Sequence, residues 1–279
     1  MSDPRAPLRL TTAQAAARLL AAQGAGVPAA VVLVVSDSAR TETHGRRLLL
    51  AGDAVTGSLG ERELDERALA LAREALERDL PEGVHDLVED EERTVRVYLE
   101  VHAPPAELVI VGAGHIAQPL CAIGALLGFR VHVLDDRPDF AVRERFPDAE
   151  RVHRVDFADP FATLPLDRRS HLVLVTRGHK YDYECLRHAL AMDPEPAYIG
   201  MIGSRRRVRA TFVQLIREGF PRERVAQVRA PVGLDLKAQT PAEIAVSVAA
   251  EIILLRKGGS GRPLRDLERV VERFIPDET

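Results

Sequence analysis

A glycine-rich segment directly after an apolar run has the residue types and spacing of a phosphate-binding turn. The run 108–111 reads as a buried strand and continues into GAGHIA at residues 112–117. Gly112 would allow a tight turn, and Gly114 would let a diphosphate approach the backbone. The N–H groups at the start of the following helix would face the anion. The segment therefore predicts a site for a phosphate-bearing ligand.

An acidic pair follows at the distance at which dinucleotide-binding turns place a carboxylate. The apolar run 131–134 ends at Asp135, about 20 residues after the glycine turn. There an acid would bind a ribose 2′-OH, and Asp135 with Asp136 would disfavour a 2′-phosphate. NAD is one ligand that fits this pattern, but folds with such a turn also carry other ligands.

Two further polar clusters follow apolar runs, TRGHKYD at residues 176–182 and GSRRR at residues 203–207. Carboxyl ends of parallel strands face one crevice, so we expect the clusters to meet there. Ser204 would cap a helix and place Arg205 and Arg206 beside its N-terminus, where an anion is favoured. Alternatively, these arginines simply solvate a helix surface. The predicted cofactor-binding residues are Gly112, Gly114, His115, Asp135, Arg177, His179, Gly203, Ser204, Arg205 and Arg206.

Two of these residues, His115 and His179, are of a type that transfers protons near neutral pH, although loop histidines are also often merely polar. The sequence has neither a nucleophile elbow nor a P-loop, so hydrolase and kinase functions lose their main support. No metal site is expected, because metal-ligand spacing is missing around His44, His85, His102 and His153.

The elements that position these residues fall on two sides of Pro104-Pro105. Before it, the patterns predict a helix at 12–22, a strand at 29–35, a hairpin at 46–55, a helix at 61–78 and an edge strand at 94–102. After it, strands begin near Leu108, Val131, Arg151, Leu172 and Ala197, separated by helices or loops. This order predicts an α/β fold: a Rossmann-like doubly wound parallel sheet preceded by a smaller α+β domain.

The C-terminal part begins with a capping box, Thr240 to Glu243, that opens a helix. Residues 244–255 are apolar nearly all round, so this helix should lie in the core or at a dimer seam. A flexible linker at 258–261 and a short helix at 264–274 follow. We therefore predict domains at residues 1–103 and 106–257, then a tail at 258–279.

Composition narrows the classes of function. The 279 residues are 46% hydrophobic with a net charge of −4, which disfavours nucleic acid as a partner and suits small ligands or proteins. Cys121 and Cys185 fall in predicted helices, as buried thiols of a reducing cytosol would. No signal peptide or apolar run of membrane-spanning length is visible, so the expected location is cytoplasmic, without a membrane partner.

Several segments together resemble one family. VGAGHIAQPL, LGFRVHVLDDRPDFA, TRGHKYDYECL, YIGMIGSRRR and APVGLDLKAQTPAEIAVSVAAEI are similar, in order and spacing, to the C-terminal half of the xanthine dehydrogenase accessory factor (XdhC/CoxI) family, over residues 107–257. The resemblance implies a cofactor-binding chaperone rather than an enzyme. Such a chaperone binds molybdenum cofactor, assists its sulfuration with a cysteine desulfurase, and inserts it into a molybdenum hydroxylase such as xanthine dehydrogenase. We also expect a homodimer.

The N-terminal half departs from that family. Its usual G-x-x-G-G-G-C-L-E segment corresponds to residues 57–65 here, with Glu63 in place of the cysteine. A carboxylate is a poor ligand for soft metals and cannot carry sulfur. Two alternatives stay open: an NAD-dependent oxidoreductase that uses the same crevice with His179 or Lys180 as proton donor, and a scaffold that pairs with a homologue.

Overall fold

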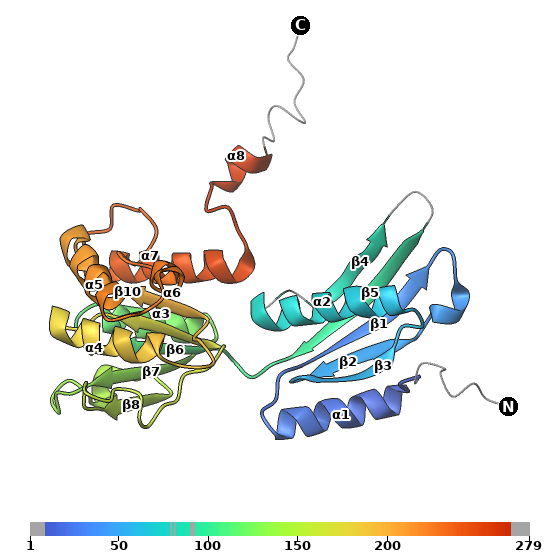
Figure 1. Cartoon of the computed structure of the whole chain (residues 1–279), viewed down its shortest axis with the longest axis horizontal. Coiled ribbons are helices and arrows are strands. Elements are labelled where there is room, and N and C mark those ends of the chain that lie inside the picture. Colours follow the sequence, from blue (N-terminus) through green and yellow to red (C-terminus); the bar gives the residue numbers. More distant parts are fainter. Residues whose placement is uncertain (1–8, 79, 81, 90–92, 269–279) are drawn as a thin grey trace, which may run out of the picture.

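The chain forms two five-stranded sheets, one after the other (Figure 1). The computed structural model describes residues 9–268, except 79, 81 and 90–92. The first sheet is antiparallel, in the order β3-β2-β1-β5-β4, and the second is parallel, in the order β10-β9-β6-β7-β8. The predicted fold class, a doubly wound parallel sheet preceded by a smaller α+β part, is confirmed.

The antiparallel region corrects one strand prediction. Its strands are β1 (Ala29–Asp37), β2 (Arg47–Ala51), β3 (Ala54–Ser58), β4 (Gly83–Glu89) and β5 (Thr94–His102). The strand predicted at the edge, β5, lies between β1 and β4 instead. The prediction missed β4, because Gly83, His85 and Asp86 weaken the pattern typical of a strand.

Helices cover both faces of the antiparallel sheet. The helix α1 (Thr12–Gly24) packs Leu19 and neighbouring alanines on the face that holds Val31. The helix α2 (Arg62–Arg78) packs Leu64 and a row of buried alanines on the opposite face, which holds Val32. Small side chains at helical spacing let α2 lie close to the strands. A short 3-10 helix, η1 (Thr41–Thr43), follows β1.

The strand order of the parallel sheet fixes where a ligand would bind. Its strands are β6 (Glu107–Val111), β7 (Arg130–Asp135), β8 (Arg151–Arg154), β9 (Ser170–Leu174) and β10 (Tyr198–Met201). The chain builds outward from β6 to β8 on one side, and then from β9 to β10 on the other. The direction of winding reverses between β6 and β9, and open parallel sheets bind ligands at the carboxyl ends beside such a switch point.

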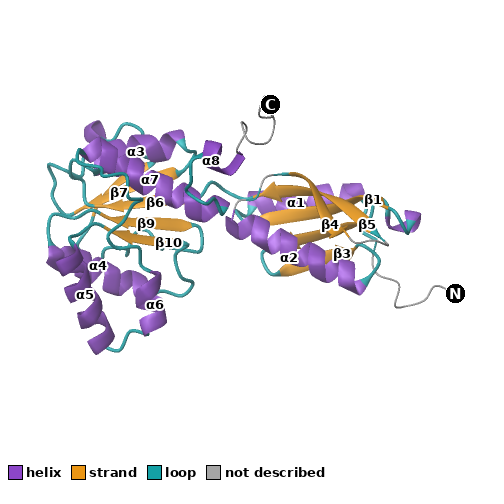
Figure 2. Ribbon diagram, turned by 90° about the horizontal axis from the view of Figure 1, so that it is seen from above, coloured by secondary structure: helices purple, strands orange, loops and turns teal. Residues whose placement is uncertain are grey.

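Helices lie on both faces of the parallel sheet (Figure 2). The helices α3 (Ala117–Leu126) and α7 (Pro241–Lys257) cover one face. The other face is covered by α4 (His179–Leu190), α5 (Arg205–Arg217) and α6 (Arg222–Gln227). Cys121 and Cys185 are buried free thiols in α3 and α4, as expected. A 3-10 helix, η2 (Arg143–Arg145), lies between β7 and β8.

The last long helix, α7, keeps an exposed apolar face. The predicted capping box of Thr240 and Glu243 is present. Ala245, Val248 and Ile252 are buried against α3 and the sheet, whereas Val246 and Ile253 are 50% and 41% exposed. The core of the described chain therefore covers only part of the helix. The following helix, α8 (Leu264–Glu268), is shorter than predicted, and the rest of the predicted helix lies outside the described residues. In the described part, no helix combines the length and apolarity needed to span a membrane.

Candidate cofactor-binding site

The two glycines of the predicted turn have different roles. Gly112 has a φ of +107°, and a Cβ there would lie 2.6 Å from the carbonyl oxygen of Val175. Only glycine fits, because the turn after β6 packs directly against the end of β9. A Cβ on Gly114 would meet nothing within 4 Å. Gly114 thus leaves open space beside the backbone, as a diphosphate requires.

The carboxylate of Asp135 is occupied by internal contacts. It is buried and accepts hydrogen bonds from the Ala113 N–H at 2.7 Å and from the guanidinium of Arg137 at 2.8 Å. Burial by itself would raise the pKa of Asp135, but these hydrogen bonds outweigh burial and lower the pKa to about 2. Asp135 therefore stays ionised and holds the glycine turn against β7.

Arg177 joins the loop after β9 to the loop after β7. Its guanidinium forms a bidentate ion pair with Asp136, at 2.5 and 2.8 Å, and donates to the hydroxyl of Tyr181 at 3.0 Å. It also lies 3.9 Å from Asp135. The hydrogen bonds to Asp136 raise the pKa of Arg177 above its usual range. The structure thus brings together the glycine turn, the acidic pair and Arg177 at the switch point.

Two arginines that the sequence pattern did not indicate, Arg137 and Arg145, also lie at the turn. Arg145 donates to the Ala113 carbonyl oxygen at 3.2 Å. Its Nε is buried and has no hydrogen-bond partner among the described residues. Both guanidinium groups stack on Phe140, at 3.5 and 4.6 Å from the ring centroid. A surplus of donors near an open backbone suits an anionic ligand.

The GSRRR cluster follows β10, the edge strand. Ser204 is the N-cap of α5 and accepts from the Arg207 N–H, as predicted. Arg205 and Arg206 are exposed, and among the described residues no hydrogen bond or ion pair joins them or Gly203 to the glycine turn. Their role as an anion site stays a prediction.

The two candidate histidines each lie close to the start of a helix. His115 is exposed two residues before α3, and no hydrogen bond to it is seen among residues 9–268 where these are described. His179 is the first residue of α4. An acid–base role for either histidine stays a prediction.

Glu63, which stands where the family has a cysteine, lies in the region of the antiparallel sheet. Glu63 is in the first turn of α2, 75% exposed at its side chain, and pairs with Arg67 at 2.8 Å. The neighbouring Glu61 bonds to Arg93 at the start of β5. That strand ends at His102, where the chain passes to the parallel sheet. Glu63 is therefore at the far end of β5 from the Rossmann domain, roughly 25 Å along the strand.

Comparisons with known proteins identify the family of the parallel-sheet region. The XdhC Rossmann domain matches residues 108–252, more than half of the chain. A protein of Escherichia coli called YqeB, described as uncharacterized, is 29% identical over 245 residues, which are 84% of this chain and 44% of YqeB. A probable xanthine dehydrogenase subunit of Bacillus subtilis is 30% identical over 169 residues, 60% of this chain and 48% of the relative. The molybdenum cofactor insertion chaperone PaoD of Escherichia coli is 28% identical over 153 residues, 55% and 41% of the two chains.

The aligned part is less than half the length of each of these curated relatives. A crystal structure of a xanthine dehydrogenase from Bacillus halodurans superposes with a TM-score of 0.58 and 24% identity. The superposition covers 92% of this chain and 68% of that chain, which shows a shared fold. With the family's Rossmann domain matched across the glycine turn, the acidic pair and the TRGHKYD and GSRRR clusters, the chain belongs to the XdhC family.

Proposed function

We propose that this chain binds molybdenum cofactor at the glycine turn of its Rossmann domain, assists sulfuration of the cofactor, and delivers it to a molybdenum hydroxylase such as xanthine dehydrogenase. Family membership supports an accessory role of this kind, and so does the likeness to an insertion chaperone. The observation that carries the proposal is the open backbone at Gly114, at the switch point of the sheet, with guanidinium groups beside it.

The residues present fit such a cofactor. A pterin dithiolene with a terminal phosphate needs anion donors and shelter from water. The start of α3 offers backbone N–H groups next to Gly114. The unpartnered Nε of Arg145 and the guanidinium of Arg177, which is shared with Asp136, offer further donors. The phosphate would lie at the turn, with Arg177 and Arg145 as its side-chain partners.

Sulfur handling points to a partner protein. Burial raises the pKa of Cys121 to about 11, and burial raises the pKa of Cys185 further still. Buried thiols that stay protonated are poor nucleophiles. Since Glu63 stands where the family has a cysteine, none of these positions presents a thiolate. The sulfur would come from a cysteine desulfurase that acts on the cofactor while this chain holds it.

In the oxidoreductase alternative, Asp135 would have to bind the ligand directly. A nicotinamide dinucleotide would use that carboxylate for its ribose hydroxyls. Here Ala113 and Arg137 already donate to it, so a ribose would have to displace strong internal bonds. The structure gives this alternative no specific support.

Anaerobic titration calorimetry with molybdenum cofactor tests the proposal. Gly114→Val places a side chain in the open space at the turn, and we expect affinity to fall at least about tenfold, the loss of one or two charge-assisted contacts. Gly24→Val is the matched control, since a Cβ there also meets nothing within 4 Å, but the residue ends α1. Unchanged affinity in Gly114→Val, or tighter binding of NAD than of molybdenum cofactor by the wild type, would refute the proposal.

A second experiment separates the two interpretations of the GSRRR cluster. Replacing Arg205 and Arg206 with alanine removes two exposed charges near the N-terminus of α5. If they bind a ligand anion, affinity falls by about tenfold or more at low salt, and the loss shrinks as salt rises. If they only solvate the helix, the affinity of the double variant equals that of the wild type at every salt concentration.

A further inference from the structure

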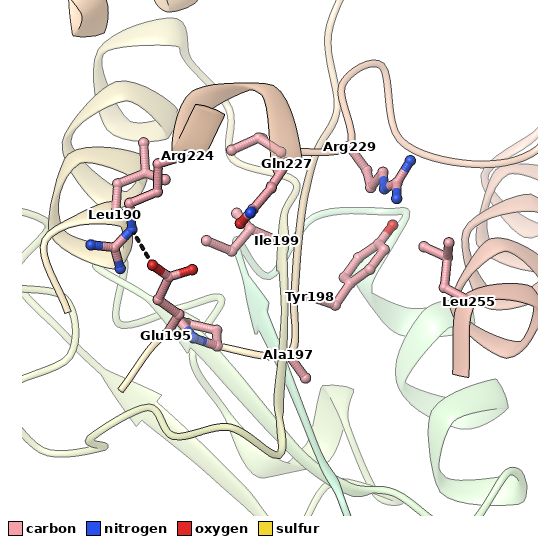
Figure 3. A pocket seen from close by; sticks show the side chains of 11 residues that line it. Leu190, Glu195, Ala197, Tyr198, Ile199, Arg224, Gln227, Arg229 and Leu255 are labelled. Carbon is pink, nitrogen blue, oxygen red and sulfur yellow. Dashed lines mark ion pairs between the residues drawn. The ribbon is translucent and has the colours of Figure 1, made fainter. Parts of the chain in front are cut away.

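A pocket lies at the opposite end of the parallel sheet from the glycine turn. Figure 3 shows it around the amino end of the edge strand β10, with Tyr198 and Ile199 at its centre. Residues from the ends of α4 and α7, Leu190 and Leu255, complete its apolar lining. Its volume is about 230 Å³. An engineered apolar cavity of about 150 Å³ binds benzene, so this volume suits a small organic molecule.

The hydroxyl of Tyr198 lacks a partner in this pocket. Tyr198 is 5% exposed, and its hydroxyl oxygen has no hydrogen bond among the described residues. Burial raises the pKa of Tyr198 well above its usual range, so the group is a protonated donor. A buried unsatisfied hydroxyl costs about 1–3 kcal/mol. In Figure 3 the hydroxyl points toward the guanidinium of Arg229. The two groups therefore lie on the same side of the pocket.

The charges of the lining are unbalanced. Arg224 forms an ion pair with Glu195 at 2.8 Å and donates to the Met192 carbonyl oxygen at 2.7 Å. Arg229, by contrast, has no ion pair with any described residue. Arg229, an exposed residue, is therefore the lining arginine that can pair with an anion beside the Tyr198 hydroxyl, on which the charge of Glu251, outside the lining, also acts.

We propose that this pocket binds a small organic carboxylate. The carboxylate accepts from Arg229 and from the Tyr198 hydroxyl, and its apolar part lies against the Tyr198 ring and Leu255. This site does not depend on the proposed function, because it shares no residue with the glycine turn and lies at the other end of the strands.

Titration calorimetry with benzoate tests the site, with benzamide as the neutral probe of the same shape and inorganic phosphate as the anion without an apolar part. We expect one benzoate site per chain and at least about tenfold weaker binding of benzamide, because it lacks the charge that pairs with Arg229. Phosphate should not bind there. No benzoate binding, or binding of phosphate or benzamide as strong as that of benzoate, would overturn the proposal.

Variants locate the ligand. Tyr198→Phe keeps the ring but removes a donor to a charged carboxylate, so it should weaken benzoate about tenfold or more, and Arg229→Gln should weaken it by at least as much. Arg222→Gln, an exposed arginine of α6 outside the lining, is the matched control. Equal affinity in Tyr198→Phe, Arg229→Gln and the wild type would place the ligand elsewhere and contradict the proposal.

Discussion

Asp136 and Arg177 form an ion pair across the switch point, and under the proposed function this pairing would compete with the binding of an anionic ligand. The bidentate contact fixes the guanidinium beside the glycine turn, and the Tyr181 hydroxyl gives it a second partner. Asp136→Asn weakens the ion pair and removes a negative charge, while Tyr181 still orients Arg177. We expect inorganic pyrophosphate and molybdenum cofactor to bind about fivefold more tightly to this variant.

Calorimetry of the two ligands measures this change. Asp139→Asn is the matched control, because Asp139 is an exposed carboxylate in the same loop without an ion pair to any described residue. If Asp136→Asn and Asp139→Asn bind pyrophosphate equally well, Arg177 does not contact the anion.

The side chains at the turn show what the sequence could and could not indicate. Arg177 follows a predicted strand, so its place at the carboxyl edge could be predicted. Arg145 contacts Ala113, far back in the chain, through a loop that folds over the turn. Nothing in the local pattern around Arg145 distinguishes it from a solvated surface arginine. The position of Asp135 at the end of its strand could be predicted, but its hydrogen-bond partners could not. Nothing in the sequence indicates that Ala113 and Arg137 both donate to this carboxylate.

Glu63 gives a test of which part of the chain holds the cofactor. Glu63→Cys restores a soft ligand at the position of the family cysteine. Since α2 begins at the far end of β5 from the Rossmann domain, we expect the affinity for molybdenum cofactor and the retention of sulfur to change little. Glu66→Cys, also in α2 and exposed, controls for adding a thiol. A large gain for Glu63→Cys alone would place the site in the antiparallel region.

At the scale of elements, the sequence pattern predicted the strands of the parallel sheet more fully than those of the antiparallel sheet. The central strands β6 and β9 are buried and largely apolar, and each of the five parallel strands begins near its predicted residue. In the antiparallel sheet, β5 has the alternation of a half-exposed strand, with Val95 and Val97 buried and Arg96 exposed between them. That alternation is equally compatible with an edge and an inner position. Only the pairing with β4, whose own pattern is weak, decides between them.

A buried cluster across the strands makes stability depend on pH. His132 of β7 lies 3.2 Å from His153 of β8 and 3.9 Å from Glu107 of β6. Burial, and then the neighbouring His153, lower the pKa of His132 to about 4. The unfolded chain takes up this proton near pH 6.5, whereas the folded chain resists it, so stability is full above pH 6.5 and declines as pH falls toward 4.

We expect His132 to account for about 2 kcal/mol of lost unfolding free energy between pH 7 and pH 5. The lowered pKa of His153 adds to the loss, and the raised pKa of Glu107 opposes it. His132→Gln keeps a polar group but does not titrate, so its urea-unfolding free energy should fall less over this range. His115→Gln, at an exposed position, should follow the wild type. Parallel declines in wild type and His132→Gln would contradict this account.

At the scale of the whole molecule, both sheets are covered by helices in the same way. The antiparallel sheet has a helix on each face, and the parallel sheet has helices on both faces as well. The exposed face of α7 is the place where this covering is incomplete. Since β5 is an inner strand, it has no unpaired edge at Thr94 that a second chain could extend. The exposed apolar surface that a second chain could cover is formed by Val246 and Ile253, which lie two turns apart on one side of α7.

We therefore predict a homodimer that buries this face of α7. Light scattering at micromolar concentration should give twice the chain mass of 30.7 kDa. The double change Val246→Glu with Ile253→Glu places two charges at the seam and should give the mass of one chain, because a buried unpaired carboxylate is strongly unfavourable. Leu126→Glu, at an 86% exposed leucine at the end of α3, is the control and should leave the dimer intact. A wild-type mass of 30.7 kDa would show that the exposed apolar face of α7 has another partner or none, and a dimer that persists in the double variant would place the seam elsewhere.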